Sequence, residues 1–160
     1  MISEEEFKSA RMAALRLLKF GPRSEKELRR KLTDKGFPEE LQDLVLTDLK
    51  TKGFINDAKL ANLFAAHKSG SKPVGKRLIL AQLKAKGIDA GVAQQAVESQ
   101  TAGQDEYAVV RALAEQRFSR MQGLTREAAQ RRLLGFLGRR GFSSDLVYRV
   151  VRELTNEVAR

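Results

Sequence analysis

The feature that most constrains the fold of this chain is an internal repeat. A glycine that follows a basic residue recurs as Gly36, Gly87 and Gly141, at intervals of 51 and 54 residues. A leucine stands four residues before each glycine, and Phe or Ile follows it. Self-similarity at a fixed period is typical of repeat proteins, in which each repeat buries its apolar face against its neighbours. The 160 residues therefore predict three repeats in an elongated, curved row.

Helix start and stop signals divide the best-defined repeat into helices. Ser24 and Glu27 form a capping box, in which each side chain accepts a hydrogen bond from a free backbone N–H group. Gly36 stands where a left-handed residue commonly ends a helix, and Pro38 opens the next helix without loss of a hydrogen bond. Apolar residues recur at helical spacing and no stretch alternates with period two, so the fold class is predicted to be all-α. The three-helix repeats are expected at residues 1–56, 57–103 and 104–160.

Composition excludes several classes of protein. Without cysteine the chain has neither a disulfide framework nor a thiolate metal site, and His67 is its only histidine, so no metal cluster or histidine-based triad can form within it. No apolar run approaches the length that spans a bilayer, and residues 1–20 read as an acid-capped amphipathic helix rather than a signal peptide. We expect a cytoplasmic monomer without a metal or a cofactor.

The net charge of +10 points to acidic partners, since such a surplus attracts polyanions and acidic protein surfaces. Residues 58–88 hold seven Lys and Arg and no carboxylate, and residues 117–140 hold seven Arg against Glu127 alone. The predicted partner-binding or DNA-binding residues are Lys68, Lys72, Lys76, Arg77, Lys84, Arg117, Arg120, Arg126, Arg131, Arg132, Arg139 and Arg140. The alternative is that they form solvated helix faces, but the long acid-free run favours binding.

The two basic stretches differ in detail. Lys72, Lys76 and Arg77 are expected on one side of a helix whose Leu78 and Leu83 face inward. In the third repeat every basic residue is arginine, which donates in a planar fork suited to phosphates and carboxylates. A compositional preference for arginine would produce the same bias, so both interpretations stay open.

Other patterns have plainer structural interpretations. Residues 70–77 fit a phosphate-loop pattern except that Arg77 replaces Ser or Thr, and Pro73 lacks a backbone donor, so we predict a connection between helices. Carboxylates within residues 39–48 are expected to complement a helix start and its solvent face. Tyr107, Tyr148 and the phenylalanines lie on apolar stripes and are interpreted as core, with base stacking as the alternative.

Three segments carry a resemblance to a known family. They are ALRLLKFGPRSEKELRRKLTDKGF in the first repeat, GFINDAKLANLF at the first junction and GKRLILAQLKAKGI in the second repeat. In this order the chain resembles the RecX family, the regulatory proteins of the RecA recombinase. The resemblance covers nearly the whole chain and is weakest in the third repeat, where Gly135 and Gly138 fall inside the second helix.

The resemblance implies a non-enzymatic inhibitor. In that family the protein lodges in the helical groove of the recombinase filament on single-stranded DNA and interferes with filament growth, ATP hydrolysis, strand exchange and co-protease activity. This implies a role in DNA repair and the SOS response. Basic faces suit a groove bounded by acidic protein and phosphates, which is an independent physical argument.

Two other functions remain as alternatives. Residues 28–49 superficially fit a helix-turn-helix regulator of duplex DNA, but Glu39, Glu40 and Asp43 would then face the major groove among the phosphates. A general single-strand binder would use the basic faces without any recombinase. An enzyme is disfavoured because no nucleophile, base and oxyanion donor can be named together.

Overall fold

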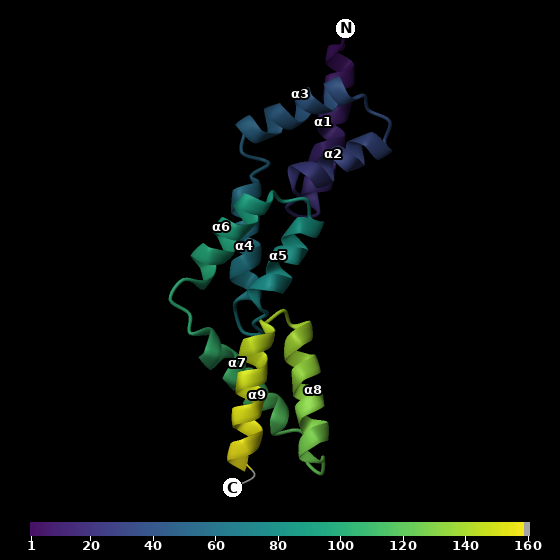
Figure 1. Cartoon of the computed structure of the whole chain (residues 1–160). Helices are drawn as coiled ribbons and strands as arrows, with labels where there is room; N and C mark the ends of the chain where they lie inside the picture. Colours follow the sequence, from purple (N-terminus) through teal and green to yellow (C-terminus); the bar gives the residue numbers. More distant parts are fainter. Residues whose placement is uncertain (159–160) are drawn as a thin grey trace. The chain divides into compact units, whose positions relative to one another are not determined.

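The computed structural model describes residues 1–158, and within that range it contains nine α-helices and no strand (Figure 1). The helices are α1 (Glu4–Lys19), α2 (Glu25–Asp34), α3 (Glu39–Thr51), α4 (Asp57–Lys68), α5 (Lys76–Ala85), α6 (Ala90–Thr101), α7 (Glu106–Phe118), α8 (Arg126–Arg139) and α9 (Ser144–Val158). The all-α prediction is therefore confirmed, and the nine helices follow one another as three sets of three. None of these helices combines the length and the apolarity needed to cross a bilayer.

The capping box predicted at Ser24 is present, and two other helices also begin at a side-chain cap. Capping boxes are present at Ser3 with Glu6 and at Ser24 with Glu27. The Thr125 hydroxyl accepts a hydrogen bond from the Ala128 N–H at 3.2 Å and so caps α8. Helix α8 continues without a break through Gly135 and Gly138.

The repeated glycine ends the second helix of each set. Gly36, Gly87 and Gly141 have φ of +83°, +80° and +84°, a left-handed conformation that only glycine adopts without cost. In the first turn the Gly36 N–H donates to Thr33 O at 2.8 Å and the Phe37 N–H donates to Leu32 O at 3.1 Å. This pair of bonds is a Schellman motif, and the left-handed glycine at its centre is the helix end that the sequence predicts.

The described chain divides into two compact units. Unit 1 is residues 1–64 with 82–96, and the described part of unit 2 is residues 65–81 with 97–158. The buried apolar cluster of unit 1 comprises Ala10, Ala14, Leu28, Leu32, Leu41, Val45, Leu46, Leu49 and Ile55. That of unit 2 comprises Val110, Ala114, Leu133, Leu137, Phe142, Val147, Val150, Val151 and Leu154. Each terminal set of three helices thus has a core built from the apolar stripes that the sequence shows.

The prediction that all aromatic residues belong to the core is wrong for three of them. Tyr148, Phe20 and Phe54 are 62%, 82% and 51% exposed. Phe20 and Phe54 lie just beyond the ends of α1 and α3, where no neighbouring turn of helix covers them. Tyr148 lies beside the buried stripe of α9 rather than on it, so its ring is open to solvent.

Candidate nucleic-acid and partner interface

Unit 2 brings the first basic stretch against the third repeat. The loop between α4 and α5 lies on the turn between α8 and α9, where the Gly75 N–H donates to Arg140 O at 2.6 Å. The Arg140 guanidinium donates back to Pro73 O at 2.9 Å and to Lys72 O at 3.4 Å. It also lies 5.2 Å from the centroid of the Phe136 ring. Arg140, predicted as a binding residue, is therefore engaged in holding the two predicted basic stretches together.

Close backbone approach at this junction depends on glycine. Gly75 is buried, and a Cβ atom there would overlap the backbone of Gly141. A Cβ atom on Gly141 would in turn lie 2.6 Å from the Leu78 backbone nitrogen. The glycine that resembles part of a phosphate loop is thus a packing residue, and the segment connects two helices as predicted.

Five of the other predicted cations of unit 2 lie on two helices, α5 and α8. Lys76 and Arg77 begin α5, and Arg131, Arg132 and Arg139 lie along α8, and all five are exposed. Within residues 1–158 none of these five forms an ion pair with a carboxylate, which leaves their charge available to an anion.

Lys72 is not on the helix predicted for it. It is exposed in the loop before α5, because the residue before a proline is driven out of the helical conformation and Pro73 follows it. Lys68 is half-buried at the end of α4. Both residues are nonetheless close in sequence to the start of α5, so the basic stretch remains continuous.

Two of the other predicted arginines of the third repeat, Arg117 and Arg126, contact side chains of the same repeat. Arg117, exposed near the end of α7, lies 5.2 Å from the Phe136 ring centroid, and Arg120 is exposed just beyond that helix. Arg126 donates a hydrogen bond to the Asn156 side chain. Stacking and neutral hydrogen bonds leave the positive charge of these side chains uncompensated.

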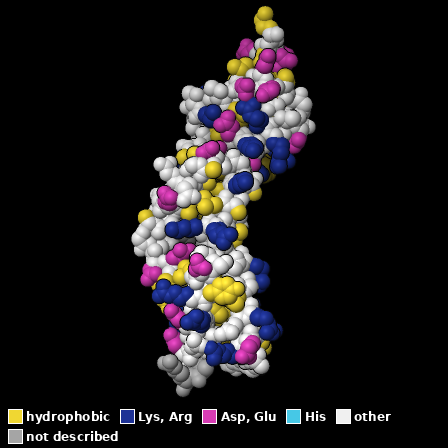
Figure 2. Space-filling model, in the orientation of Figure 1, with side chains coloured by type: hydrophobic (Ala, Val, Ile, Leu, Met, Phe, Trp, Pro, Cys, Tyr) yellow, Lys and Arg dark blue, Asp and Glu magenta, His cyan; other side chains and the backbone are white. Residues whose placement is uncertain are grey.

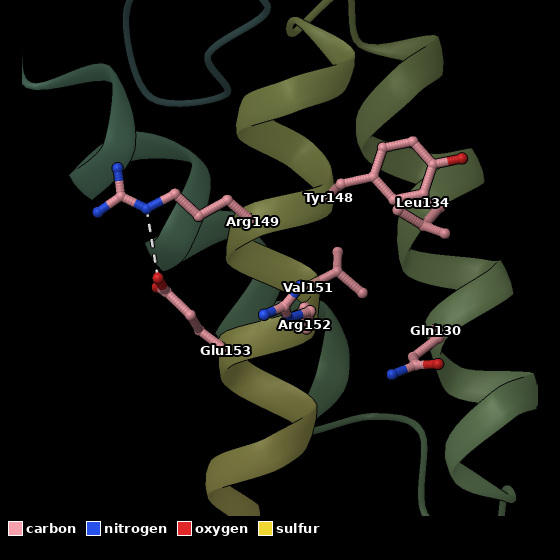
Figure 3. A pocket seen from close by; sticks show the side chains of 7 residues that line it. All are labelled: Gln130, Leu134, Tyr148, Arg149, Val151, Arg152 and Glu153. Carbon is pink, nitrogen blue, oxygen red and sulfur yellow. Dashed lines mark hydrogen bonds and ion pairs between the residues drawn. The ribbon is translucent and has the colours of Figure 1, made fainter.

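A groove that the sequence did not reveal lies between α8 and α9 (Figure 3). It has a volume of about 550 Å³ and is lined by Gln130, Leu134, Tyr148, Arg149, Val151, Arg152 and Glu153. Figure 3 shows the Tyr148 ring reaching from α9 across Leu134 of α8, while Arg149 and Glu153 point to the other side of α9. The groove therefore offers an exposed aromatic face beside the exposed Arg152.

The acidic residue of this groove is already neutralised. The Arg149 Nε donates to Glu153 at 3.2 Å, and the Arg149 guanidinium lies 4.7 Å from the Tyr107 ring centroid. The hydrogen bond from the Tyr107 hydroxyl is the main cause that holds the pKa of Glu153 below its usual value, and the same bond raises the pKa of Tyr107. Arg152 has no such ion pair within residues 1–158, so the groove presents net positive charge.

A second basic groove lies in unit 1, between α2 and the end of α5. Its volume is about 400 Å³, and its lining residues are Lys26, Glu27, Arg29, Arg30, Thr33, Lys84, Ala85, Lys86 and Gly87. Only Lys84 was predicted, because the first repeat has nearly balanced charge along the sequence and its cations gather only on folding. Arg29 pairs with Asp43 at 2.7 Å and Lys86 lies over the Phe64 ring, which leaves Lys26, Arg30 and Lys84 as exposed cations.

The charges are distributed over both units rather than gathered in one patch. Figure 2 shows Lys and Arg side chains along the drawn face of each unit, with acidic side chains between them. Within residues 1–158 no three side chains of the types that bind metals lie together. The geometry offers hydrogen-bond donors and positive charge, which suits the binding of an anionic polymer or an acidic protein surface.

These features define a class: an all-α protein of three consecutive three-helix repeats with cations on its surface. Three family models match the chain, and they describe the first, second and third three-helix domains of RecX at residues 10–49, 56–97 and 104–151. The chain belongs to the RecX family.

Curated relatives and solved structures agree with this assignment. The chain is 34% identical over 154 residues to the regulatory protein RecX of Amycolatopsis mediterranei, which covers 96% of this chain and 87% of the relative. It is 33% identical over 150 residues to that of Thermobifida fusca, covering 94% and 80%. The crystal structure of RecX from Lactobacillus salivarius has the same fold, with a TM-score of 0.81 at 23% identity over 95% of this chain and 98% of that one. These relatives are named regulatory proteins, and the chain is accordingly assigned to a family of regulators.

Proposed function

We propose that this chain inhibits the RecA recombinase by binding, as a monomer in the cytoplasm, in the groove of the recombinase filament on single-stranded DNA. It would there modulate ATP hydrolysis, strand exchange and co-protease activity in DNA repair and the SOS response, without a catalytic step of its own. Family membership supports the regulatory role. The observation that carries the site is the set of exposed cations on the start of α5 and along α8, which have no carboxylate partner within the described residues of unit 2.

The physical argument concerns long-range attraction. Unpaired surface cations raise the local concentration of an anionic partner and speed its association, and this effect weakens as salt is added. A filament on single-stranded DNA offers phosphates and acidic protein side by side, so both kinds of contact can use the same arginines and lysines.

The test is ATP hydrolysis by the cognate recombinase on single-stranded DNA, titrated with this protein at two salt concentrations. Inhibition at well below one copy per recombinase monomer would show action on the filament. The triple variant Lys72→Glu, Lys76→Glu and Arg77→Glu is expected to keep its helical circular dichroism and to lose inhibition.

A matched control reverses three cations outside both grooves: Lys19→Glu, Lys31→Glu and Lys59→Glu. It changes the net charge by the same amount, so equal loss in both triple variants would mean that only total charge matters. If the Lys72, Lys76 and Arg77 variant still inhibits fully, these three cations do not belong to the binding site. If the wild-type chain does not inhibit, the proposal is refuted.

Direct binding to single-stranded DNA is a second candidate, favoured by the exposed Tyr148 beside Arg152. Aromatic rings stack on bases with little regard to sequence, at about 1 to 3 kcal/mol for each base. The chain has no Trp and two Tyr, so its intrinsic fluorescence reports on Tyr148 once Tyr107 is changed to Phe. Oligo(dT) is expected to quench that signal in the absence of recombinase, and Tyr148→Ala should weaken binding where Tyr148→Phe does not.

A further inference from the structure

The turn after the second helix occurs three times, and two of its copies are covered by the preceding repeat. In unit 1 the Ser24 hydroxyl donates to Lys86 O, and a Cβ atom on Gly87 would lie 2.7 Å from the Lys26 side chain. In unit 2 the Gly75 N–H donates to Arg140 O at 2.6 Å, at the turn formed by Gly141. Each covered turn therefore receives a hydrogen bond from the residue that precedes the second helix of the repeat before it.

The first copy of the turn is uncovered. Within residues 1–158, and apart from Gly36 itself and its two chain neighbours, no heavy atom lies within 4 Å of a Cβ atom built on Gly36, and no backbone donor reaches Lys35 O. Phe37 is only half-buried, whereas Ile88 and Phe142 at the same position are 4% exposed. The glycine φ is nearly the same in the three turns, and the three turns differ in what covers them.

A shallow cavity of about 610 Å³ adjoins this uncovered turn within unit 1. Its lining residues are Lys8, Ser9, Met12, Ala13, Arg16, Lys35 and Phe37. Met12 is 49% exposed and, with Phe37, gives the cavity an apolar floor. No carboxylate is among its described lining residues, and although Lys8 pairs with Glu4 at 2.6 Å, Arg16 and Lys35 form no ion pair within residues 1–158.

We propose that this face docks an acidic loop of a partner protein, which takes the place that the preceding repeat takes at the other two turns. An apolar side chain of the loop would lie on Met12 and Phe37, its carboxylates would approach Arg16 and Lys35, and a backbone N–H would donate to Lys35 O. The identification of that partner with the recombinase rests on the proposed function. This face is distinct from the cations of unit 2. It would contact the partner protein, whereas the cations of unit 2 would contact an anionic polymer.

A second copy of this chain is the less suitable occupant. The segment equivalent to the covering residues in the third repeat is 119–126, which carries Arg120 and Arg126 and no carboxylate. Stacked head to tail, it would bring these arginines towards Arg16 and Lys35, and like charges repel. The charge of the face therefore selects an acidic partner.

The experiment compares the full chain with the double variant Arg16→Glu and Lys35→Glu. Binding is measured to the recombinase filament on single-stranded DNA and, separately, to bare oligo(dT). We expect at least a tenfold loss of affinity for the filament and unchanged binding to bare DNA. The control is the double variant Lys19→Glu and Lys31→Glu, which makes the same charge change on residues outside the cavity.

The outcomes separate the two proposals. If the wild-type chain binds the filament and the two double variants bind it equally, this docking face is refuted while the proposed function stands. If the wild-type chain does not bind the filament, the proposed function fails and the assigned partner fails with it. A concentration-dependent dimer of the wild-type chain in sedimentation, absent from the Arg16→Glu and Lys35→Glu variant, would assign the face to a second copy and overturn the inference.

Discussion

The repeat junction inside unit 1 and the one inside unit 2 use the same turn but different donors. In unit 1 a buried serine hydroxyl donates to Lys86 O, so a side chain separates the two backbones. In unit 2 the donor is the backbone N–H of Gly75, at 2.6 Å from Arg140 O, and the backbones touch directly. The difference shows that copies of the same sequence repeat can pack against their neighbours in two different ways. The glycine of the turn has a left-handed φ in every copy. Its lack of a Cβ atom matters for packing only at Gly87 and Gly141, where the neighbouring repeat comes close.

The largest expected effect is at the closest junction. Gly141→Ala forces a Cβ atom into a left-handed residue and against the Leu78 backbone, and strain together with overpacking predicts a loss of about 3 to 5 kcal/mol in the free energy of unfolding. Urea unfolding followed by circular dichroism measures it. The control is Gly138→Ala, inside α8 and three residues before that turn. Nothing lies within 4 Å of its Cβ atom, so the substitution should be neutral or stabilising. Equal stability of the two variants would contradict the close approach in unit 2.

The serine junction should be weaker. Ser24→Ala removes the cap of α2 and leaves Lys86 O without its donor, so we expect a loss of about 2 kcal/mol. Ser3→Ala removes the same kind of capping box at an exposed position with no neighbouring repeat. In the same unfolding assay, the additional loss of stability in Ser24→Ala relative to Ser3→Ala measures the contribution of the contact with Lys86. Equal costs would show that the contact with Lys86 adds no stability.

The uncovered turn should tolerate substitution best among the three glycines. Gly36→Ala meets only the cost of a left-handed residue, about 1 kcal/mol, because its Cβ atom has open space. Gly87→Ala should fall between the two extremes, since the atoms it meets belong to the flexible Lys26 side chain. The loss in the free energy of unfolding is expected to increase from Gly36→Ala through Gly87→Ala to Gly141→Ala. A loss at Gly36 as large as that at Gly141 would mean that the first turn is also covered.

The smallest effect concerns pH and the pairing of α1 with α3 in unit 1. Hydrogen bonds from Lys52 and then Arg11 lower the pKa of Asp48, so the ionised carboxylate stabilises the fold above its unfolded pKa and that contribution disappears as pH falls through the folded value. Asp48→Asn should therefore lower Tm slightly near pH 7 and leave it unchanged near pH 2. Glu40→Gln, at the exposed start of α3, is the control. It loses only the favourable interaction of a carboxylate with the helix start, so it should lower Tm by less than Asp48→Asn near pH 7. A Tm difference that persists in acid would assign the role of Asp48 to packing.

Sequence reasoning predicted the helices and their cores well, because both depend on local periodicity. The capping boxes, the glycine turns and the buried leucines of α2 and α8 all follow from residues within a few positions of one another. Its failures were at residues whose surroundings come from elsewhere in the chain. Tyr148 shares a helix with the core stripe but faces a groove. The sequence also did not reveal that Arg140 donates hydrogen bonds to a loop almost seventy residues away.

The sequence by itself determined the all-α class, the threefold repeat and the surplus of positive charge, since periodicity, caps and composition need no knowledge of distant contacts. Only the tertiary structure decided which cations share a surface. Lys26 and Arg30 meet Lys84 in one groove because the end of α5 packs beside α2, and no local pattern records that approach. It also decided that the same turn is covered twice and open once. The turns at Gly87 and Gly141 meet atoms of the repeat before them, whereas the turn at Gly36 meets none among the described residues.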